Sequence, residues 1–419
     1  MKFPIKPLIN SSVISAALLI SACGGDSSSS SGPSMQVTAT KVASVTQQAI
    51  DSAMTEQGLI ALSGQADCDV ELYRLEYSSL GVEGESVTVS GALSFPSGPG
   101  CEGPYPLLAK AHGTTTQEDY IEATVESAAF DHGFFASQGY VVVSPDYLGF
   151  GASEYDYHPF LHRDSQAQAM IDALRAARIA VDSLEENIEL SGKVMLAGYS
   201  QGGHVVMSAQ RAIEASYSDE FNLVASAPMA GPYQLEQTFL SGINPAIPNV
   251  AAGVFLSYVV ESFQNIYGNI YTDLEEVFLP QFTDDITDSF PGERSLTEFL
   301  IGGIFPTDPD QFLQNDYLND FETNRDNAFR VALRDNEVLD FTPKTPTILC
   351  GTSEDGAVPY FNTEAAAAYF NNNGVTVPVI DVADQITVIP GLNPGLIHHS
   401  LGNRYCYAAV KERLLEPAK

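Results

Sequence analysis

The sequence Gly-Tyr-Ser-Gln-Gly places Ser200 between two glycines, Gly198 and Gly202. An apolar run at residues 194–197 precedes it, and apolar residues with helical spacing follow at 205–212. A strand that turns sharply into a helix is the setting in which such a serine becomes an exposed nucleophile. The glycines fit that setting because a Cβ at either position would collide with the neighbouring strand or helix. An ordinary serine in a glycine-rich turn would have the same five residues, so this interpretation depends on partners elsewhere in the chain.

A serine hydroxyl is a weak nucleophile at neutral pH and needs a nearby base, which a third group must orient. In a doubly wound parallel sheet these partners follow the serine in the order acid, then histidine, on loops after later strands. The apolar run 346–350 is followed by two adjacent carboxylates, Glu354 and Asp355. His398 and His399 follow the last run that has the character of a strand. These four residues are therefore the candidates for the acid and the base.

The elements that must position these residues alternate between strands and helices. Alternating polarity predicts half-buried strands at 70–77 and 86–95, joined by a hairpin loop. Short apolar runs predict buried parallel strands, which are 107–111, 140–144, 194–197, 223–227, 345–350 and either 375–380 or 385–389. Helical spacing predicts helices at 43–62, 122–138, 165–184, 205–212 and 406–415. This alternation predicts an α/β fold with a doubly wound, mostly parallel sheet and right-handed crossovers.

The alternation breaks between residues 234 and 341, a stretch rich in acidic and aromatic residues. Helical spacing recurs within it at 250–263 and 296–304. The apolar run 246–260 is too short to span a bilayer. We therefore expect residues 234–341 to form a helical lid or cap, inserted over the top of the sheet between core segments at 35–233 and 342–419.

Several loops resemble those of the α/β-hydrolase superfamily. Residues 351–359, Gly-Thr-Ser-Glu-Asp-Gly-Ala-Val-Pro, are similar to the Gly-x-x-Asp-x-x-Val-Pro loop that carries the acid there, but are one residue longer. Counting back from the Val-Pro pair selects Asp355 and counting forward from the glycine selects Glu354. The resemblance favours Asp355. Of the two histidines, His399 precedes a small residue and is more similar to the superfamily's base, which leaves His398 a structural role.

The resemblance extends to the oxyanion hole, which requires two backbone N–H donors. Gln201, the residue after the nucleophile, would supply one donor. The sequence His-Gly-Thr at 112–114 follows an expected strand, as in many superfamily members. It implies a second donor at Thr114, while Gly113 lets the backbone approach the substrate. Residues 143–151 resemble a Pro-Asp-Tyr-x-Gly-x-Gly loop of esterases and lipases, in which Asp146 is structural. The histidines that precede the serine or lie on its helix are not expected to act as the base; these are His132, His158, His162 and His204.

Together with the long insertion, these motifs most resemble secreted lipases and esterases of bacteria and fungi, over roughly residues 65–415. The resemblance implies a carboxylic ester hydrolase that acts through an acyl-enzyme on a small-molecule or lipid ester. It implies neither a metal ion nor an organic cofactor. A peptidase or acyltransferase with the same triad is one alternative, and an inactive lipoprotein of this fold that binds lipid or a partner is another.

The N-terminus predicts export. Residues 1–22 combine two lysines with a short apolar stretch, which is typical of a signal peptide. The sequence Leu-Ile-Ser-Ala-Cys that ends at Cys23 resembles the lipobox of bacterial lipoproteins, which implies an acylated cysteine and attachment to a membrane. The residue after the cysteine is Gly24 rather than an aspartate, which resembles lipoproteins that are sorted to the outer membrane. The serine-rich composition of residues 23–34 predicts a flexible tether.

Four further cysteines remain, and an even number in an exported chain predicts two disulfides. We favour Cys68–Cys101 and Cys350–Cys406 because each pair lies within one terminal region of the domain. The two other pairings and four free thiols are the alternatives. No Cys-x-x-Cys or histidine-rich spacing indicates a metal site.

The charge balance excludes one class of partner. The chain has 53 acidic and 19 basic residues, so its net charge is −34. A strongly negative surface argues against binding to nucleic acid and against adhesion to anionic lipids through charge. We therefore expect no nucleic-acid partner, whereas the expected ester substrate and lipid anchor follow from the resemblances described above.

Overall fold

The structure is a computed structural model that describes residues 35–184, 186, 188–244, 251–287 and 289–419. The predicted signal peptide, the candidate lipidation site Cys23 and the serine-rich tether lie outside the described residues. Within the described part of the chain, no helix is long and apolar enough to cross a membrane.

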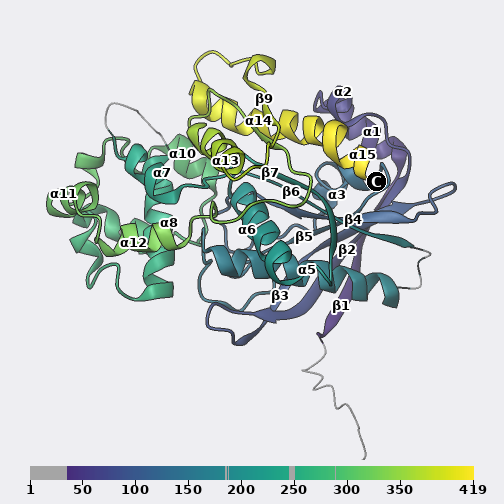
Figure 1. Cartoon of the computed structure of the whole chain (residues 1–419), viewed down its shortest axis with the longest axis horizontal. Coiled ribbons are helices and arrows are strands. Elements are labelled where there is room, and N and C mark those ends of the chain that lie inside the picture. The colour runs from purple at the N-terminus through teal and green to yellow at the C-terminus, as the bar shows by residue number, and fades with distance from the viewer. Residues whose placement is uncertain (1–34, 185, 187, 245–250, 288) are drawn as a thin grey trace, which may run out of the picture. The chain divides into compact units, whose positions relative to one another are not determined.

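Nine strands of the described chain form one sheet in the order β1-β2-β3-β5-β4-β6-β7-β8-β9 (Figure 1). Three antiparallel strands lie at one edge: β1 (Val37–Val45), β2 (Asp69–Leu80) and β3 (Ser86–Ser97). The parallel strands are β4 (Tyr105–Ala111), β5 (Val141–Pro145), β6 (Leu190–Tyr199), β7 (Asn222–Met229), β8 (Leu349–Gly351) and β9 (Val379–Asp381). Because β5 lies on one side of β4 and β6 on the other, the strand order reverses there. This confirms the predicted doubly wound α/β sheet.

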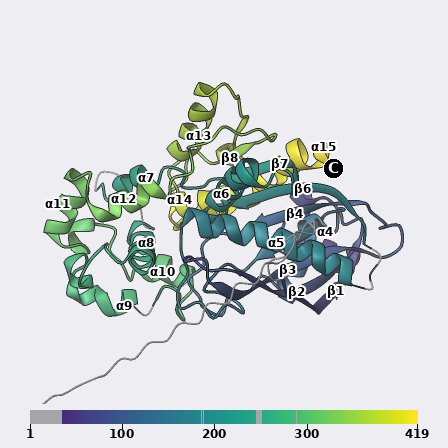
Figure 2. The same ribbon diagram turned by 60° about the horizontal axis from the view of Figure 1, so that its bottom comes forward.

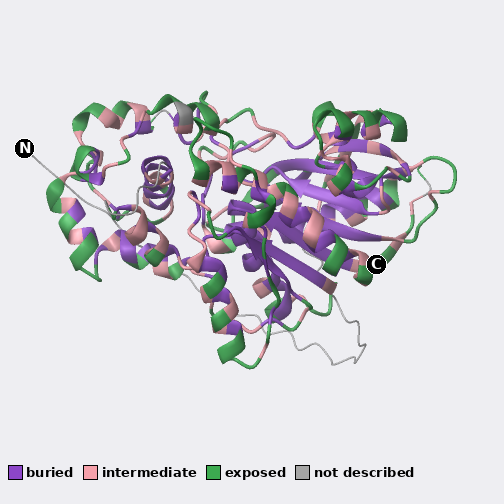
Figure 3. Ribbon diagram, turned by 90° about the horizontal axis from the view of Figure 1, so that it is seen from above, coloured by how far each residue is buried: buried purple, intermediate pink, exposed green. Residues whose placement is uncertain are grey.

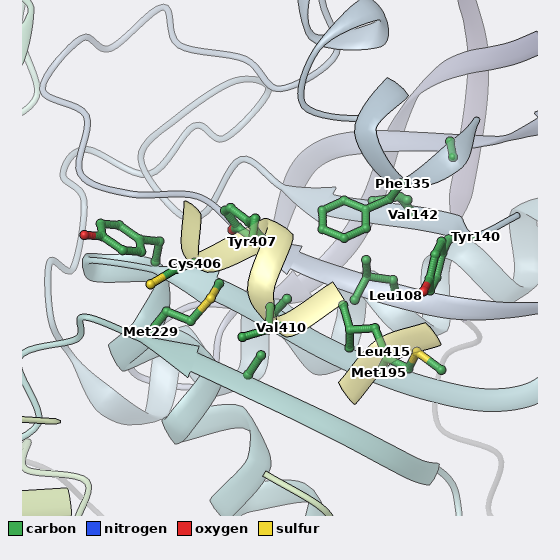
Figure 4. Close-up of a cluster of buried hydrophobic side chains, with 14 of the residues drawn as sticks. Leu108, Phe135, Tyr140, Val142, Met195, Met229, Cys406, Tyr407, Val410 and Leu415 are labelled. Atoms are coloured by element: carbon green, nitrogen blue, oxygen red, sulfur yellow. The ribbon is translucent and has the colours of Figure 1, made fainter. Parts of the chain in front are cut away.

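Helices cover both faces of this sheet (Figure 2). One face is covered by α5 (Arg163–Ser183) and α6 (Gln201–Ser216), and the other by α1 (Gln47–Glu56), α4 (Gly133–Ala136) and α14 (Pro394–Val410). Successive strand residues point to opposite faces. Leu108 of β4 accordingly packs with Phe135 and Val410 (Figure 4), whereas Ala109 packs with Leu174 of α5. The central strands, such as β4 and β5, are therefore buried on both sides, as Figure 3 shows.

Shorter segments complete the core. They are α2 (Ile60–Ser63), α3 (Val125–Ala129), α13 (Phe361–Asn372), the 3-10 helix Ala383–Gln385, the π-helix Lys411–Leu415 and α15 (Glu416–Ala418).

The chain between β7 and β8, which we call the helical region, forms the group of helices at the left of Figure 1. Its helices are α7 (Leu235–Gly242), α8 (Ala252–Tyr267), α9 (Thr283–Thr287), α10 (Leu296–Gly302), α11 (Asn315–Thr323) and α12 (Ala328–Asp335), with 3-10 helices at Leu274–Glu276, Pro280–Phe282 and Pro309–Gln311. An aromatic-rich hydrophobic cluster holds these helices together. Apart from Phe160 and Leu161, the buried members of this cluster all come from residues 235–333. The helical region therefore has a core of its own.

Two expected elements near the ends of the chain were wrong in their bounds. Residues 37–45 form the edge strand β1 rather than the start of a helix, because Val and Thr recur there with alternating exposure. The helix α1 then begins after Thr46, whose side chain accepts a hydrogen bond from the Ala49 N–H. The last long helix, α14, begins at Pro394 rather than near residue 406, because Asn393 caps it. His398 and His399 consequently lie on a helix and not on the loop before it.

Two other expectations also need correction. The crossover predicted at 122–138 is split into the short helices α3 and α4, with Phe130 as the C-cap of α3. The last strand is β9, at Val379–Asp381, and residues 385–389 contain no strand. Both errors arise where short elements carry too few residues to show a clear period.

The four cysteines form two disulfide bonds. Cys68 is bonded to Cys101 and Cys350 to Cys406, with Cα atoms 6.0 and 5.7 Å apart. This is the pairing that their positions in the sequence favoured. Cys350 and Cys406 are completely buried in one hydrophobic cluster, and Figure 4 shows Cys406 within a part of it.

Candidate active site

Ser200 lies at the sharp turn between β6 and α6. Its backbone has φ 61° and ψ −123°, a conformation that a non-glycine residue adopts only when its surroundings enforce it. A Cβ on Gly198 would come within 2.8 Å of the Ala111 Cβ, and one on Gly202 within 2.8 Å of the His112 carbonyl oxygen. These two positions therefore require glycine so that the turn can pack against the end of β4.

Three side chains from separate parts of the chain form a continuous hydrogen-bonded series. The Ser200 Oγ lies 2.9 Å from Nε2 of His399, and Nδ1 of His399 lies 2.7 Å from Oδ2 of Asp355. The Asp355 side chain is 1% exposed and that of His399 is 16% exposed. Oδ1 of Asp355 accepts the N–H groups of Ala357 and Val358, at 2.9 and 2.8 Å. The carboxylate is thus fixed by the backbone at one oxygen and faces the imidazole with the other.

The adjacent candidates point elsewhere. Nδ1 of His398 lies 3.1 Å from the Thr352 hydroxyl, and this histidine is buried away from Ser200. Glu354 is exposed to solvent, and its backbone N–H lies 3.4 Å from the Thr352 hydroxyl. The structure therefore brings Asp355 and His399, but not Glu354 and His398, to the serine.

A disulfide connects the elements that carry the carboxylate and the imidazole. Cys350 lies in β8, five residues before Asp355, and Cys406 lies in α14, two turns after His399. Because the bond joins β8 directly to α14, it restricts how far the carboxylate and the imidazole can separate.

The loop after β4 brings Gly113 and Thr114 beside the serine. A Cβ on Gly113 would lie 3.9 Å from that of Ser200. Burial lowers the pKa of His112 below its usual 6.5, so its ring is neutral and one nitrogen carries a hydrogen. Nδ1 lies 2.7 Å from the Gly113 carbonyl oxygen and Nε2 lies 3.3 Å from that of Asp146, so the closer contact favours Nδ1 as the donor. In a trans peptide the C=O and the following N–H point in opposite directions, so the Thr114 N–H is directed away from His112.

Gln201 has a partner that sequence reasoning missed. Burial lowers the pKa of His158 to about 3, so this ring is also neutral. Its Nδ1 donates to the Leu148 carbonyl oxygen at 2.8 Å, which leaves Nε2 to accept from the Gln201 side-chain amide, also at 2.8 Å. His158 thereby fixes the side chain of Gln201. No sequence motif indicates this role, since His158 lies on a loop before α5 and only the fold brings it to the serine.

Asp146, expected to be structural, is completely buried and bonds two backbone segments of the core. Its Oδ1 accepts the Glu122 N–H and its Oδ2 the Ser90 hydroxyl, each at 2.6 Å. Burial raises the pKa of this carboxyl to about 6. The histidines without an expected catalytic role form other contacts: Nδ1 of His132 lies 2.9 Å from Ser94 Oγ, that of His162 lies 3.0 Å from Ser165 Oγ, and that of His204 lies 2.8 Å from Gln166 Oε1.

A narrow cavity of about 40 Å³ opens beside Ser200, Gln201 and Thr114. Its remaining walls are mostly apolar and come from the segment before α5 and from α7 and α8. They include Phe160, Leu161, Phe239, Ile243, Phe255 and Leu256. The site can thus accept an apolar group next to the serine. Within the described residues, no group of three or more His, Cys, Asp or Glu side chains is arranged to hold a metal ion.

Residues 130–386 match the model of the secretory lipase family. The chain belongs to the secretory lipase family. This secretory lipase is therefore a carboxylic ester hydrolase. The match spans the serine and the acid loop, and it ends before α14. A comparison with curated protein sequences finds none that matches.

Solved structures agree with this assignment. The rice cell wall degrading esterase LipA of Xanthomonas oryzae is 39% identical, with a TM-score of 0.81 over 91% of this chain and 98% of that chain. Two more distant structures share the fold. A putative hydrolase of Legionella pneumophila is 24% identical, with a TM-score of 0.78 over 90% of this chain and 98% of that one. Candida antarctica lipase A is 18% identical, with a TM-score of 0.59 over 82% of this lipase and 75% of its own chain. The fold is that of the α/β-hydrolases, as the sequence motifs predicted.

Proposed function

We propose that this ester hydrolase acts through an acyl-enzyme formed on Ser200, with His399 as the base and Asp355 as the residue that orients it. The observation that supports this proposal is the hydrogen-bonded series of these three side chains, with distances of 2.9 and 2.7 Å. Both contacts lie within the range over which a nucleophile and its base exchange a proton.

In the proposed reaction, the Ser200 oxygen bonds to the ester carbonyl carbon while its proton passes to Nε2 of His399. The carbonyl π-electrons move to oxygen, and the N–H groups of Gln201 and Thr114 stabilise that oxyanion. The carbonyl re-forms, the alcohol departs and the imidazolium returns the proton to its oxygen. Water then attacks the acyl-enzyme with the same base, which releases the acid and free Ser200.

The apolar cavity beside Ser200 is suited to the acyl part of the ester. Because α7 and α8 contribute a large part of its wall, we propose that residues 234–341 serve as a lid or cap that determines which acyl group fits. The substrate would be a small-molecule or lipid ester.

We also propose that the chain is exported and anchored in the outer membrane through an acylated Cys23. The support is the lipobox-like sequence at residues 19–23 and the two disulfides, since such bonds persist in oxidising compartments. Several acyl chains on one residue provide firm attachment without a spanning helix.

The reaction is tested with p-nitrophenyl butyrate and a fluorophosphonate probe. Ser200→Ala should reduce kcat by at least about 10⁴-fold and abolish labelling. Ser208→Ala, a change of the same kind two turns further along α6, should leave both unchanged. Asp355→Asn should reduce kcat on the order of 10³–10⁴-fold, whereas Glu354→Gln should not reduce it. Retained labelling in Ser200→Ala would refute the assignment of the nucleophile.

The anchor is tested by metabolic labelling with a fatty acid. The wild type and Ser27→Ala should incorporate the label, and Cys23→Ala should not. Equal incorporation in all three proteins would exclude Cys23 as the acylated residue.

A further inference from the structure

Tyr147 has a backbone conformation that its neighbours must enforce. Its φ is 73°, in the left-handed region where a bulky side chain is a genuine outlier. The residue follows β5 and is buried in the hydrophobic cluster on the face of the sheet that α5 and α6 cover. A strained residue of this kind persists only where the surrounding structure holds it, and such residues concentrate at functional sites. The contacts of the Tyr147 side chain therefore indicate what the strain supports.

The Tyr147 ring stacks on the ring of His112. Their centroids lie 4.0 Å apart and their planes differ by 25°. Burial raises the pKa of Tyr147 well above its usual 10, so the hydroxyl keeps its proton, and it donates to the His112 carbonyl oxygen at 3.1 Å. The His112 ring in turn holds the Gly113 carbonyl oxygen at 2.7 Å. Two successive peptide groups are thus fixed just before the N–H of Thr114.

The same tyrosine ring also stacks on His158. These centroids lie 5.8 Å apart, with an angle of 19° between the ring planes. His158 accepts a hydrogen bond from the Gln201 side-chain amide and donates one to the Leu148 carbonyl oxygen, each at 2.8 Å. Because Leu148 directly follows Tyr147, one loop holds this histidine through both its backbone and its side chain. Tyr147 therefore contacts the supports of both proposed oxyanion donors.

The residues on either side of Tyr147 contact the same two histidines. The Asp146 carbonyl oxygen lies 3.3 Å from Nε2 of His112, and the Leu148 carbonyl oxygen accepts from His158. Glycine or asparagine would adopt the left-handed conformation at lower cost. The aromatic side chain must therefore offset that cost through its contacts with the two rings and with the His112 carbonyl.

We propose that Tyr147 is a positioning residue that sets the spacing of the two oxyanion donors, the N–H groups of Gln201 and Thr114. This inference rests on the proposed function, because the donors act only if an oxyanion forms when Ser200 attacks the ester. Tyr147 does not line the cavity beside Ser200, so it has no direct contact with the acyl group there. Its effect falls on the transition state, in which the carbonyl oxygen carries charge, and not on binding of the ester.

The test compares Tyr147→Phe and Tyr147→Leu in the hydrolysis of p-nitrophenyl butyrate. Tyr147→Phe loses the hydrogen bond to the His112 carbonyl but keeps the ring, so kcat should fall about three- to ten-fold. Tyr147→Leu loses the ring as well and should lower kcat on the order of 100-fold. KM should change by less than about two-fold in both variants. Tyr77→Phe is the matched control and should leave kcat unchanged, because the Tyr77 hydroxyl is buried in the same cluster and has no hydrogen-bond partner among the described residues.

A trifluoromethyl ketone reports on the oxyanion directly. The Ser200 oxygen adds to the carbonyl carbon of trifluoromethyl propyl ketone, its proton passes to His399, and the carbonyl oxygen becomes the oxyanion of a hemiketal. The inhibition constant should rise in both Tyr147 variants by the same factor by which kcat/KM falls. A merely structural role would lower the midpoint of thermal unfolding and the fraction of active enzyme, but would leave the inhibition constant of that active fraction unchanged.

A wild-type kcat and a wild-type inhibition constant in both Tyr147 variants would overturn the proposal. A loss that appears in KM alone, or equally in Tyr77→Phe, would overturn it too. If circular dichroism shows that Tyr147→Leu does not fold, the result for Tyr147→Phe decides by itself. Failure of the proposed function gives a different result, because hydrolysis and fluorophosphonate labelling would then persist in Ser200→Ala, whatever the Tyr147 variants do.

Discussion

Removal of the Cys350–Cys406 disulfide should impair catalysis in a way that removal of the other disulfide does not. The chain-entropy relation gives about 4.2 kcal/mol of stability for a sequence separation of 56 and about 3.7 kcal/mol for one of 33. The two bonds therefore contribute almost equally to stability, with a difference of only about 0.5 kcal/mol. Their positions differ, because only Cys350–Cys406 joins the strand before Asp355 to the helix of His399.

The perturbation is the pair of double variants Cys350→Ala/Cys406→Ala and Cys68→Ala/Cys101→Ala. Both should lower the urea midpoint of unfolding by similar amounts. A misplacement of a catalytic group by about 1 Å costs on the order of 100-fold in rate. We therefore expect at least about a ten-fold fall in kcat for the first variant under conditions in which it remains folded, and little change for the second.

The assay is the hydrolysis of p-nitrophenyl butyrate at low temperature, with circular dichroism on the same samples to verify folding. A folded Cys350→Ala/Cys406→Ala protein with wild-type kcat would refute the reasoning. An equal loss of kcat in both variants would refute it too, because the effect would then follow stability and not the position of the bond.

Three further results are expected. In the fold, burial raises the pKa of Asp146 to about 6 from an ordinary value of 3.8, so the folded carboxyl holds its proton more tightly than the unfolded one. The protonated carboxyl therefore stabilises the fold below about pH 4, and this contribution is lost as the pH rises through about 6. The free energy of unfolding of Asp146→Asn, measured by urea unfolding, should therefore rise by about 3 kcal/mol relative to that of the wild type between pH 4 and pH 7. His158→Phe should lower kcat about ten-fold with little change in KM. This fall in kcat is smaller than the one caused by removal of an oxyanion donor, because the Gln201 N–H remains. An unchanged kcat would exclude the positioning role of His158. Gly202→Ala should destabilise the protein by about 3 kcal/mol or more in thermal unfolding, because its Cβ would meet the His112 carbonyl oxygen at 2.8 Å.

The sequence predicted the sheet and the order of the active-site candidates because both depend on local patterns. Buried parallel strands appear as short apolar runs, and the glycines around Ser200 report a backbone constraint directly. The resemblance favoured Asp355 over Glu354, but the orientation of the Asp355 carboxylate was beyond such reasoning. It depends on a turn in which the Ala357 and Val358 N–H groups bind one oxygen of Asp355 and direct the other toward the histidine.

Other features depend on contacts that no local pattern encodes. His158 reaches Gln201 from 43 residues away in the sequence, and the tautomer that permits this bond is set by the Leu148 carbonyl. A cavity of about 670 Å³ likewise combines residues of α1 and α2, of the segment from β4 to α4, and of α14. Long-range packing therefore decides both features, and the sequence alone predicts neither.

The separate core of the helical region has a consequence for how this enzyme can diverge. Among the residues that the structure describes, its hydrophobic cluster draws on the rest of the chain through Phe160 and Leu161 alone, and both of these residues also line the cavity beside Ser200. Substitutions within residues 235–333 can therefore reshape the acyl cavity while Ser200, Asp355 and His399 keep their packing. Selection can alter substrate preference through residues of one hydrophobic cluster while the reacting groups, which lie outside that cluster, are inherited unchanged, which makes the helical region the natural segment to exchange between related lipases.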